Sequence, residues 1–242
     1  MVGEPMTFSD DTLPVAARKT GIEAMNYASW GTHFCLLYET REDLIDVFVP
    51  YLRAGLENGE GCLWITSELL GQDEAAAAIE EQVPDFRQYV RKKQLSITPY
   101  SEQYLKDRVF DRQRVIDSWI GRYNEILGQG YGGMRLAADL SWLKRKDWKD
   151  FTEYEKQAND TFRSLRTLAL CAYWLKRFSV SELIDIMRNH CLLLIRQYGR
   201  WISLDRSSIT TPTRQLTPLQ RAFLRAGFEG LNDQGILTLN YY

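Results

Sequence analysis

The 242-residue sequence lacks the patterns that identify several large classes of protein. It has no phosphate loop of the GxxxxGK(S/T) type and no GxSxG nucleophile elbow. Its cysteines, at positions 35, 62, 171 and 191, form no CxxC pair and lie inside apolar runs. These absences argue against acyl-transfer enzymes, zinc sites and disulfide frameworks, and we predict reduced thiols in the core.

Charge and hydropathy exclude further classes. A formal net charge of −2 gives no general attraction to nucleic acid or to an anionic membrane. The first residues show no basic-then-apolar signal peptide, and no run approaches the roughly 20 apolar residues of a membrane span. We therefore expect a cytoplasmic protein that contacts no membrane and does not bind nucleic acid directly.

Residues 33–66 have the pattern strand, turn, helix, turn, strand. Phe34–Tyr38 and Cys62–Thr66 are apolar and β-prone, and the apolar residues between them recur at helical spacing. Thr40 can cap the helix, with Asp43 in capping-box spacing. Such a βαβ unit seeds a parallel sheet. The turn after its first strand holds three carboxylates and no glycine, where many such units cradle phosphate.

Helices and strands alternate through the rest of the chain. Helices are predicted at 13–30, 73–81, 86–93, 111–128, 147–165 and from Ser179 or Ser181 to Gly199, and strands at 94–100, 134–140, 167–174 and 201–204. This alternation predicts an α/β fold with three layers, a mostly parallel sheet with helices on both faces.

A stretch rich in Ser, Thr and Pro at 207–218 is linker-like and sets the predicted domain boundaries. We divide the chain into an N-terminal extension (1–29), a core domain (30–206) and a tail (207–242). Within the tail we predict a short helix at 218–226 and a β-prone end at 236–242.

Ligands of parallel α/β sheets usually bind outside the carboxyl ends of the strands. In this interpretation those ends carry Tyr38, Asp139, Trp142 and Tyr173, an aromatic and mildly acidic rim. Such a rim suits a small apolar or weakly polar ligand better than a triphosphate. The alternatives are that the aromatics only cover the sheet end and that Asp139 caps a turn.

The two histidines, His33 and His190, are far apart in the sequence and have no neighbouring set of ligands. A core or surface position is the simpler interpretation of each. A metal pair, or His33 with Cys35, would need tertiary contacts that the sequence does not give. We predict no metal and no cofactor. The basic run at 144–149 is interpreted as a solvated face, because acidic residues interrupt it.

Several segments, in their order and spacing, resemble the MEDS family, the sensory domain named for methanogens, methylotrophs and the dichloromethane-responsive regulator. They are the opening HFCLLYETREDLIDVFVPYLRAGLENGEGCLWIT, the middle GYGGMRLAADLSWL, a helix with Trp148, Tyr154-Glu155 and Asn159, and LCAYW followed by a helix ending in RNHC. The resemblance covers about residues 30–200. It implies a RecA/KaiC-like core that has lost the phosphate loop. It also implies the ligand-binding candidates His33, Cys35, Tyr38, Arg135, Asp139, Trp142, Glu155, Asn159, Cys171, Tyr173 and His190.

The family is proposed to sense small hydrocarbon derivatives and is often joined to DNA-binding or kinase modules. The resemblance therefore implies a non-enzymatic sensory domain for a small organic molecule, acting in signalling or transcription regulation. One alternative is a degenerate KaiC/RecA-like nucleotide-binding protein, against which the carboxylates of the first turn count. The other is a ligand-free scaffold that binds a protein partner, or a second copy, through residues 207–242.

Overall fold

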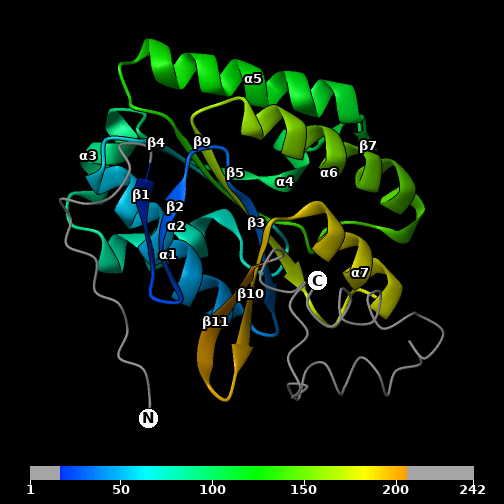
Figure 1. Ribbon diagram of the computed structural model, residues 1–242. Coiled ribbons are helices and arrows are strands. Elements are labelled where there is room, and N and C mark those ends of the chain that lie inside the picture. Colours follow the sequence, from blue (N-terminus) through cyan, green and yellow to red (C-terminus); the bar gives the residue numbers. More distant parts are fainter. Residues whose placement is uncertain (1–16, 206–242) are drawn as a thin grey trace.

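The computed structural model describes residues 17–205, and a seven-stranded sheet runs through their centre (Figure 1). Its strands are β3 (His33–Tyr38), β4 (Gly61–Thr66), β5 (Leu95–Pro99), β8 (Met134–Asp139), β9 (Thr167–Trp174), β10 (Leu192–Gln197) and β11 (Arg200–Asp205). They lie in the order β11, β10, β3, β9, β8, β4, β5. All neighbours pair in parallel except β10 and β11, which form an antiparallel hairpin. The predicted mostly parallel α/β sheet is confirmed.

The opening βαβ unit forms as predicted, with α1 (Arg41–Glu57) between β3 and β4. The Thr40 side chain accepts a hydrogen bond from the amide of Asp43, and the Asp43 carboxylate accepts from the amide of Thr40. This capping box fixes the start of the helix. Every residue of β3 and β4 is buried, because helices cover both faces of the sheet.

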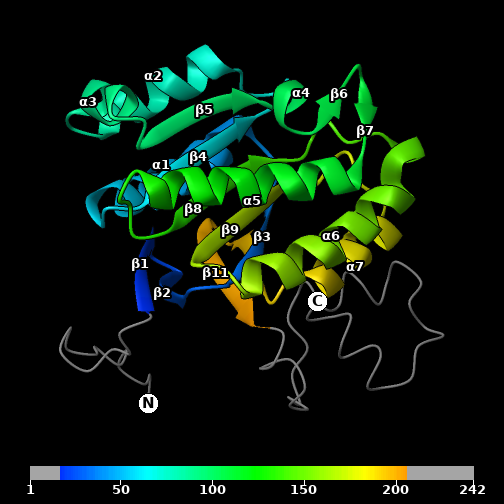
Figure 2. The same ribbon diagram turned by 90° about the horizontal axis from the view of Figure 1, so that it is seen from above.

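Two helical layers enclose the sheet (Figures 1 and 2). The layer of α1 contains α2 (Gln72–Gln82) and α3 (Phe86–Arg91), and the opposite layer contains α5 (Arg112–Gly128), α6 (Trp148–Arg163) and α7 (Val180–Asn189). Side chains alternate between the two faces along each strand. In β3, Phe34 and Leu36 pack in the core beneath α1, whereas Cys35 and Leu37 pack in the core beneath α5 and α6.

Short elements between β5 and α5 complete the second core. They are α4 (Tyr100–Gln103), β6 (Leu105–Lys106) and β7 (Val109–Phe110), the last two forming a small antiparallel hairpin. The segment has no helical or alternating pattern in the sequence and was not predicted as regular structure. It places Tyr104 and Phe110 against the aromatic side chains of α6.

The helix predicted over 13–30 is wrong for the residues that the structure describes. Residues 17–29 form an antiparallel hairpin, β1 (Ala17–Ile22) and β2 (Met25–Ser29), which packs on α1. Gly21 has a φ of +78°, and a Cβ there would lie 2.1 Å from the carbonyl oxygen of Pro50 in α1. This left-handed residue and the close approach of two backbones exclude a helix over these residues.

The helix predicted from Ser179 or Ser181 to Gly199 is too long. Ser179 is the cap, and α7 ends at Asn189. The apolar run Leu192–Ile195 belongs instead to β10, which pairs with β3. A continuous apolar run fits both periodicities, so the sequence alone did not separate them. His190 therefore lies in the link between α7 and β10, not within a helix.

Residues 1–16 and 206–242 lie outside the described residues. The predicted helix at 218–226 and the β-prone end at 236–242 fall there and remain predictions. No described helix combines the length and the apolar character needed to cross a membrane.

Candidate functional site

The turn after β3, where many βαβ units bind phosphate, is closed by its own side chains. The Asp43 carboxylate accepts the backbone amides of Glu39 and Thr40, each at 3.0 Å. It also accepts Nη1 of Arg196 at 2.7 Å. The amides of Glu39 and Thr40, which precede α1 and could otherwise bind a phosphate, already bind a carboxylate. This arrangement argues against a nucleotide at the turn.

Two predicted candidates, Tyr38 and Asp139, meet at the carboxyl ends of β3 and β8. The Tyr38 hydroxyl donates to Oδ1 of Asp139 at 2.8 Å, and the hydroxyls of Ser67 and Ser141 donate to the other oxygen. All four residues are buried. Burial raises the pKa of Asp139, and the hydrogen bonds from the hydroxyls oppose that rise. These side chains therefore form a closed hydrogen-bond network at the rim.

Trp142, which follows this network, lies in an aromatic cluster. Its ring stacks on Tyr100 at a centroid distance of 5.4 Å and contacts Tyr104 at 5.1 Å and Phe151 at 6.2 Å. Its indole nitrogen is buried without a hydrogen-bond partner. Trp142 is therefore buried among aromatic rings with its donor unused.

Arg135 lies apart from the other candidates, on the face of the sheet that α1 covers. Its Nε donates to Oε2 of Glu60 at 2.5 Å, and both side chains are fully buried. The guanidinium also donates to the carbonyl oxygens of Lys19, Thr20 and Tyr51 at 2.8 to 3.2 Å. These contacts tie the β1–β2 hairpin to the core, so the structure gives Arg135 a structural role.

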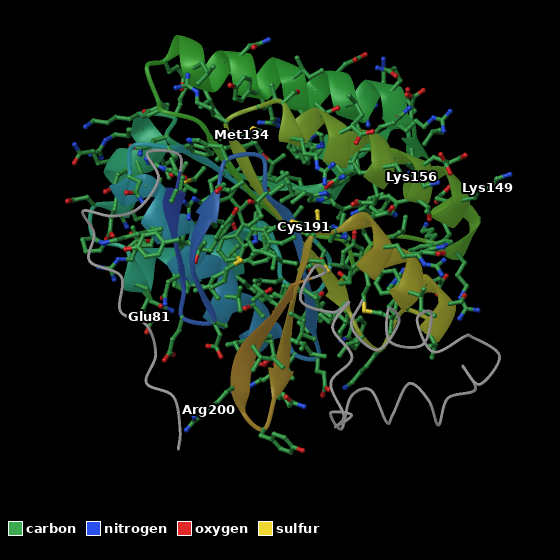
Figure 3. All side chains as sticks on the ribbon, viewed as in Figure 1. Glu81, Met134, Lys149, Lys156, Cys191 and Arg200 are labelled. Carbon is green, nitrogen blue, oxygen red and sulfur yellow. The ribbon has the colours of Figure 1, made fainter. Side chains whose placement is uncertain are left out.

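The remaining candidates meet beneath α6, on the face covered by α5, α6 and α7. They are His33, Cys35, Glu155, Asn159, Cys171, Tyr173 and His190. They come from β3, β9, α6 and the link between α7 and β10, and the adjacency of β10, β3 and β9 brings them together. Cys191, labelled at the centre of Figure 3, marks the place where this link reaches the sheet.

Four donor atoms converge at the centre of this group, which we call the His/Glu/Cys cluster: His33, Glu155, Cys171 and His190. One ligand atom from each lies within 4.8 Å of all the others, and all four residues are buried. Nε2 of His33 lies 3.3 Å from Sγ of Cys171 and 3.6 Å from Oε2 of Glu155. Nε2 of His190 lies 3.4 Å from the same Oε2. The cluster thus joins two imidazoles, a thiol and a carboxyl group around one point.

Burial decides the protonation of these groups. It raises the pKa of Glu155 to about 8, although the nearby Tyr173 hydroxyl opposes the rise. It lowers the pKa of His190 to about 4, against the hydrogen bond to the Ile186 carbonyl. Burial and the neighbouring imidazole also lower the pKa of His33, and burial raises that of the Cys171 thiol. Without a cation the cluster is therefore mainly neutral at about pH 7.

Polar atoms that lack a partner gather on one face of the sheet. Among the described residues, the buried side-chain nitrogen and oxygen atoms with no hydrogen-bond partner belong to His33, Tyr104, Arg114, Trp142, Glu155, Thr167, Tyr173 and His190. All of them lie on the side of the sheet that α5, α6 and α7 cover. The alternation of side chains places those on strands there, and the others lie on the helices or connecting segments of that side. Native cores usually satisfy such atoms, so this concentration distinguishes this face from the one that α1 covers.

Two contributors to this face were not among the predicted candidates. Phe162, whose ring lies edge-on to His33 at 5.5 Å, lies within the helix predicted at 147–165. Tyr104 belongs to the irregular segment between β5 and α5, and no periodicity there signalled its burial.

Comparisons with known proteins bear on this arrangement. A family model described as the MEthanogen/methylotroph, DcmR Sensory domain (MEDS) matches residues 32–191. The transcriptional repressor DcmR of Methylorubrum extorquens (strain DSM 6343 / CIP 106787 / DM4) is 25% identical over 177 residues, which are 72% of this chain and 63% of that protein. The chain therefore spans less than two thirds of the length of this relative.

A solved structure has the same fold at low sequence identity. The KaiC-like protein PH0186 from Pyrococcus horikoshii OT3 matches 80% of this chain and 88% of its own, with a TM-score of 0.53 and 14% identity. At this identity the likeness shows the fold alone, and the RecA/KaiC-like core predicted from the sequence is confirmed.

Proposed function

This chain belongs to the MEDS family of sensory domains, and from that premise we propose that it is the ligand-binding part of a transcription regulator. Its ligand is a small organic molecule derived from a hydrocarbon, and its response is a change in the binding of a protein partner in the cytoplasm. The domain catalyses no reaction in this proposal.

The observation that carries the proposal is the set of unpartnered polar atoms on the face beneath α5, α6 and α7. An unsatisfied buried donor or acceptor costs about 1–3 kcal/mol. The Trp142 indole nitrogen and the hydroxyl groups of Tyr104 and Tyr173 are three of these. A ligand with one or two polar atoms would satisfy some of them, and that gain would favour the bound state.

The apolar part of such a ligand would contact aromatic rings. Phe110 lies within 6.2 Å, between ring centroids, of Trp142, Phe151 and Tyr154. Phe151 also lies within 6.2 Å of both Trp142 and Tyr154, and these rings are beside the polar atoms. Small-molecule sites commonly combine apolar and aromatic walls with a few placed polar groups. This composition supports a small organic ligand over a nucleotide.

The link between α7 and β10 supplies a route from ligand to partner. His190 lies in that link, and its ring faces Tyr173 at a centroid distance of 5.7 Å. A ligand that moves either ring would shift the end of α7 relative to the sheet. A ligand changes a partner equilibrium only by its different affinity for the two states, and this link is where we expect the two states to differ.

Thermal unfolding in the presence of small halogenated, methylated and aromatic compounds tests the proposal, because a ligand of the native state raises the midpoint by mass action. We expect a saturable rise with at least one compound, lost in Trp142→Phe and kept in Trp64→Phe. Trp64 is the matched control, since it is equally buried but lies in the core beneath α1. A rise that persists in Trp142→Phe, or no rise in the whole panel, would contradict the proposal.

A further inference from the structure

We infer that the His/Glu/Cys cluster is a binding site for a divalent transition-metal ion, for which Zn²⁺ is the best match. The inference goes beyond the proposed function, because a metal site can be present whether or not the domain senses an organic molecule. It rests on the types of donor atom, their spacing, their orientation and the balance of charge.

The donor set is one that zinc prefers. Zn²⁺ is bound in proteins by imidazole nitrogen, thiolate sulfur and carboxylate oxygen, usually four in a tetrahedron. His33, His190, Cys171 and Glu155 supply two nitrogens, a sulfur and an oxygen. A mixed nitrogen and sulfur set disfavours Mg²⁺ and Ca²⁺, which take oxygen ligands.

The spacing of the donors agrees with a tetrahedral ion. Ligand bonds of about 2.0–2.3 Å place neighbouring donors roughly 3.3–3.6 Å apart. The separations involving His33 are 3.3 Å to the Cys171 sulfur and 3.6 Å to the Glu155 oxygen, and that oxygen lies 3.4 Å from Nε2 of His190. The other separations among the four donor atoms are no longer than 4.8 Å.

The histidine rings present the correct nitrogens. Nδ1 of His190 lies 2.7 Å from the carbonyl oxygen of Ile186, which can only accept, so Nδ1 carries the proton. The lone pair of His190 is therefore on Nε2, which faces Glu155 and has no hydrogen-bond partner. A carbonyl that fixes the tautomer of a ligand histidine is a common feature of metal sites. Nε2 of His33 likewise faces Cys171 and Glu155, and its Nδ1 has no hydrogen-bond partner.

Charge balance accounts for a dication in a buried place. On binding, the Cys171 thiol and the Glu155 carboxyl group each release a proton to solvent and become anionic ligands. Two anions and two neutral imidazoles neutralise one dication, so the buried complex carries no net charge. If these side chains formed only a structural hydrogen-bond cluster, Oε2 of Glu155 and Nε2 of His190 would remain without a hydrogen-bond partner.

Metal titration of the full chain tests the inference. Chain stripped of metal by a chelator is titrated with Co²⁺ in the spectrophotometer and with Zn²⁺ against a chromophoric chelator. The titration is repeated on chain refolded from urea with the ion present, because the site is buried and access to it can be slow. We expect a single equivalent of Co²⁺, with a thiolate-to-cobalt charge-transfer band and visible bands of tetrahedral intensity.

Matched variants identify the ligands. Cys171→Ala should lose the charge-transfer band and weaken Zn²⁺ binding about 100-fold or more, since even outer partners of a metal site contribute about 10–100-fold. Cys62→Ala, a deletion of equal size in the core beneath α1, should keep both. Glu155→Gln provides a second test that keeps side-chain volume, and it should weaken binding while the charge-transfer band remains.

Three results would overturn the inference: no stoichiometric ion in either preparation, a cobalt spectrum without a thiolate band, or equal losses in Cys171→Ala and Cys62→Ala. Far-ultraviolet circular dichroism establishes that each variant is folded before titration. No organic compound is added, so a failure here leaves the thermal-unfolding test of the proposed function unaffected.

Discussion

Replacing Glu60 by Gln should strongly destabilise the fold. The Glu60 carboxylate is fully buried and accepts Nε of Arg135 at 2.5 Å and Nε of Arg18 at 2.8 Å. Glu60→Gln keeps the size of the side chain but removes its charge. It leaves the buried Arg135 guanidinium without an anionic partner.

The magnitude follows from the contacts that remain. Removing one partner of a buried ion pair costs about 3–5 kcal/mol. Arg135 keeps its hydrogen bonds to three backbone carbonyl groups and its contact with the Tyr51 ring, at 4.7 Å from the centroid. We therefore expect a loss of stability at the lower end of this range, about 3 kcal/mol. For a domain of this size, this loss corresponds to a fall of about 6–12 °C in the midpoint of thermal unfolding.

Urea unfolding followed by circular dichroism measures this loss, and a double variant supplies the control. In Glu60→Leu with Arg135→Met, no buried charge is left unpaired, so this protein should be more stable than Glu60→Gln. This double variant should also leave Co²⁺ binding unchanged, because Arg135 lies on the opposite face of the sheet. A loss below about 1 kcal/mol in Glu60→Gln would refute the structural role of the pair.

Three further predictions concern turns and caps. Burial raises the pKa of Asp43, but the hydrogen bonds from Arg196 and the preceding amides lower it by more, so the pKa lies below its usual value. A carboxyl group whose pKa is lowered by folding stabilises the native state at pH values above its pKa in the unfolded chain, about 4. This stabilisation is lost as the pH falls through the pKa of the group in the native state. Asp43→Ala should therefore cost about 1 kcal/mol in urea unfolding at about pH 7 and less at about pH 3, and an undiminished cost at the lower pH would contradict this account. Gly21→Ala should destabilise by more than about 1 kcal/mol, because of its positive φ and its contact with Pro50, and an unchanged urea midpoint would count against the β1–β2 packing. Tyr198→Asn, at the exposed tip of the β10–β11 hairpin with a φ of 51°, should raise the thermal midpoint by the equivalent of about 0.5–1 kcal/mol, whereas a fall would mean that the turn differs.

Local patterns account for the parts of the fold that the sequence predicted. The Thr40–Asp43 capping box and the apolar strands around it are determined by neighbouring residues, and they appear where expected. The end of α7 was misplaced because Leu192–Ile195 can satisfy either period, and pairing with β3 decides between them. Gly21 lies within the range predicted as a helix, whereas contact with α1 gives it a conformation that only the fold requires.

The candidate site was only partly predictable, for a related reason. The resemblance to a family selected most of the residues beneath α6, but it did not say which of them touch. His33 and His190 are separated by most of the domain in sequence, yet their ring centroids lie 4.2 Å apart because β10 pairs with β3. General reasoning about parallel sheets pointed to the carboxyl rim, where Tyr38 and Asp139 satisfy one another.

X-ray absorption spectroscopy at the zinc edge, on the zinc-loaded full chain, identifies the atoms that bind the ion. If the His/Glu/Cys cluster is the centre of this domain's ligand chemistry, the first shell contains one sulfur at about 2.3 Å and nitrogen or oxygen atoms at about 2.0–2.2 Å, and the sulfur disappears in Cys171→Ala. A first shell without sulfur in the unaltered chain, or a sulfur that persists in Cys171→Ala, would contradict the account.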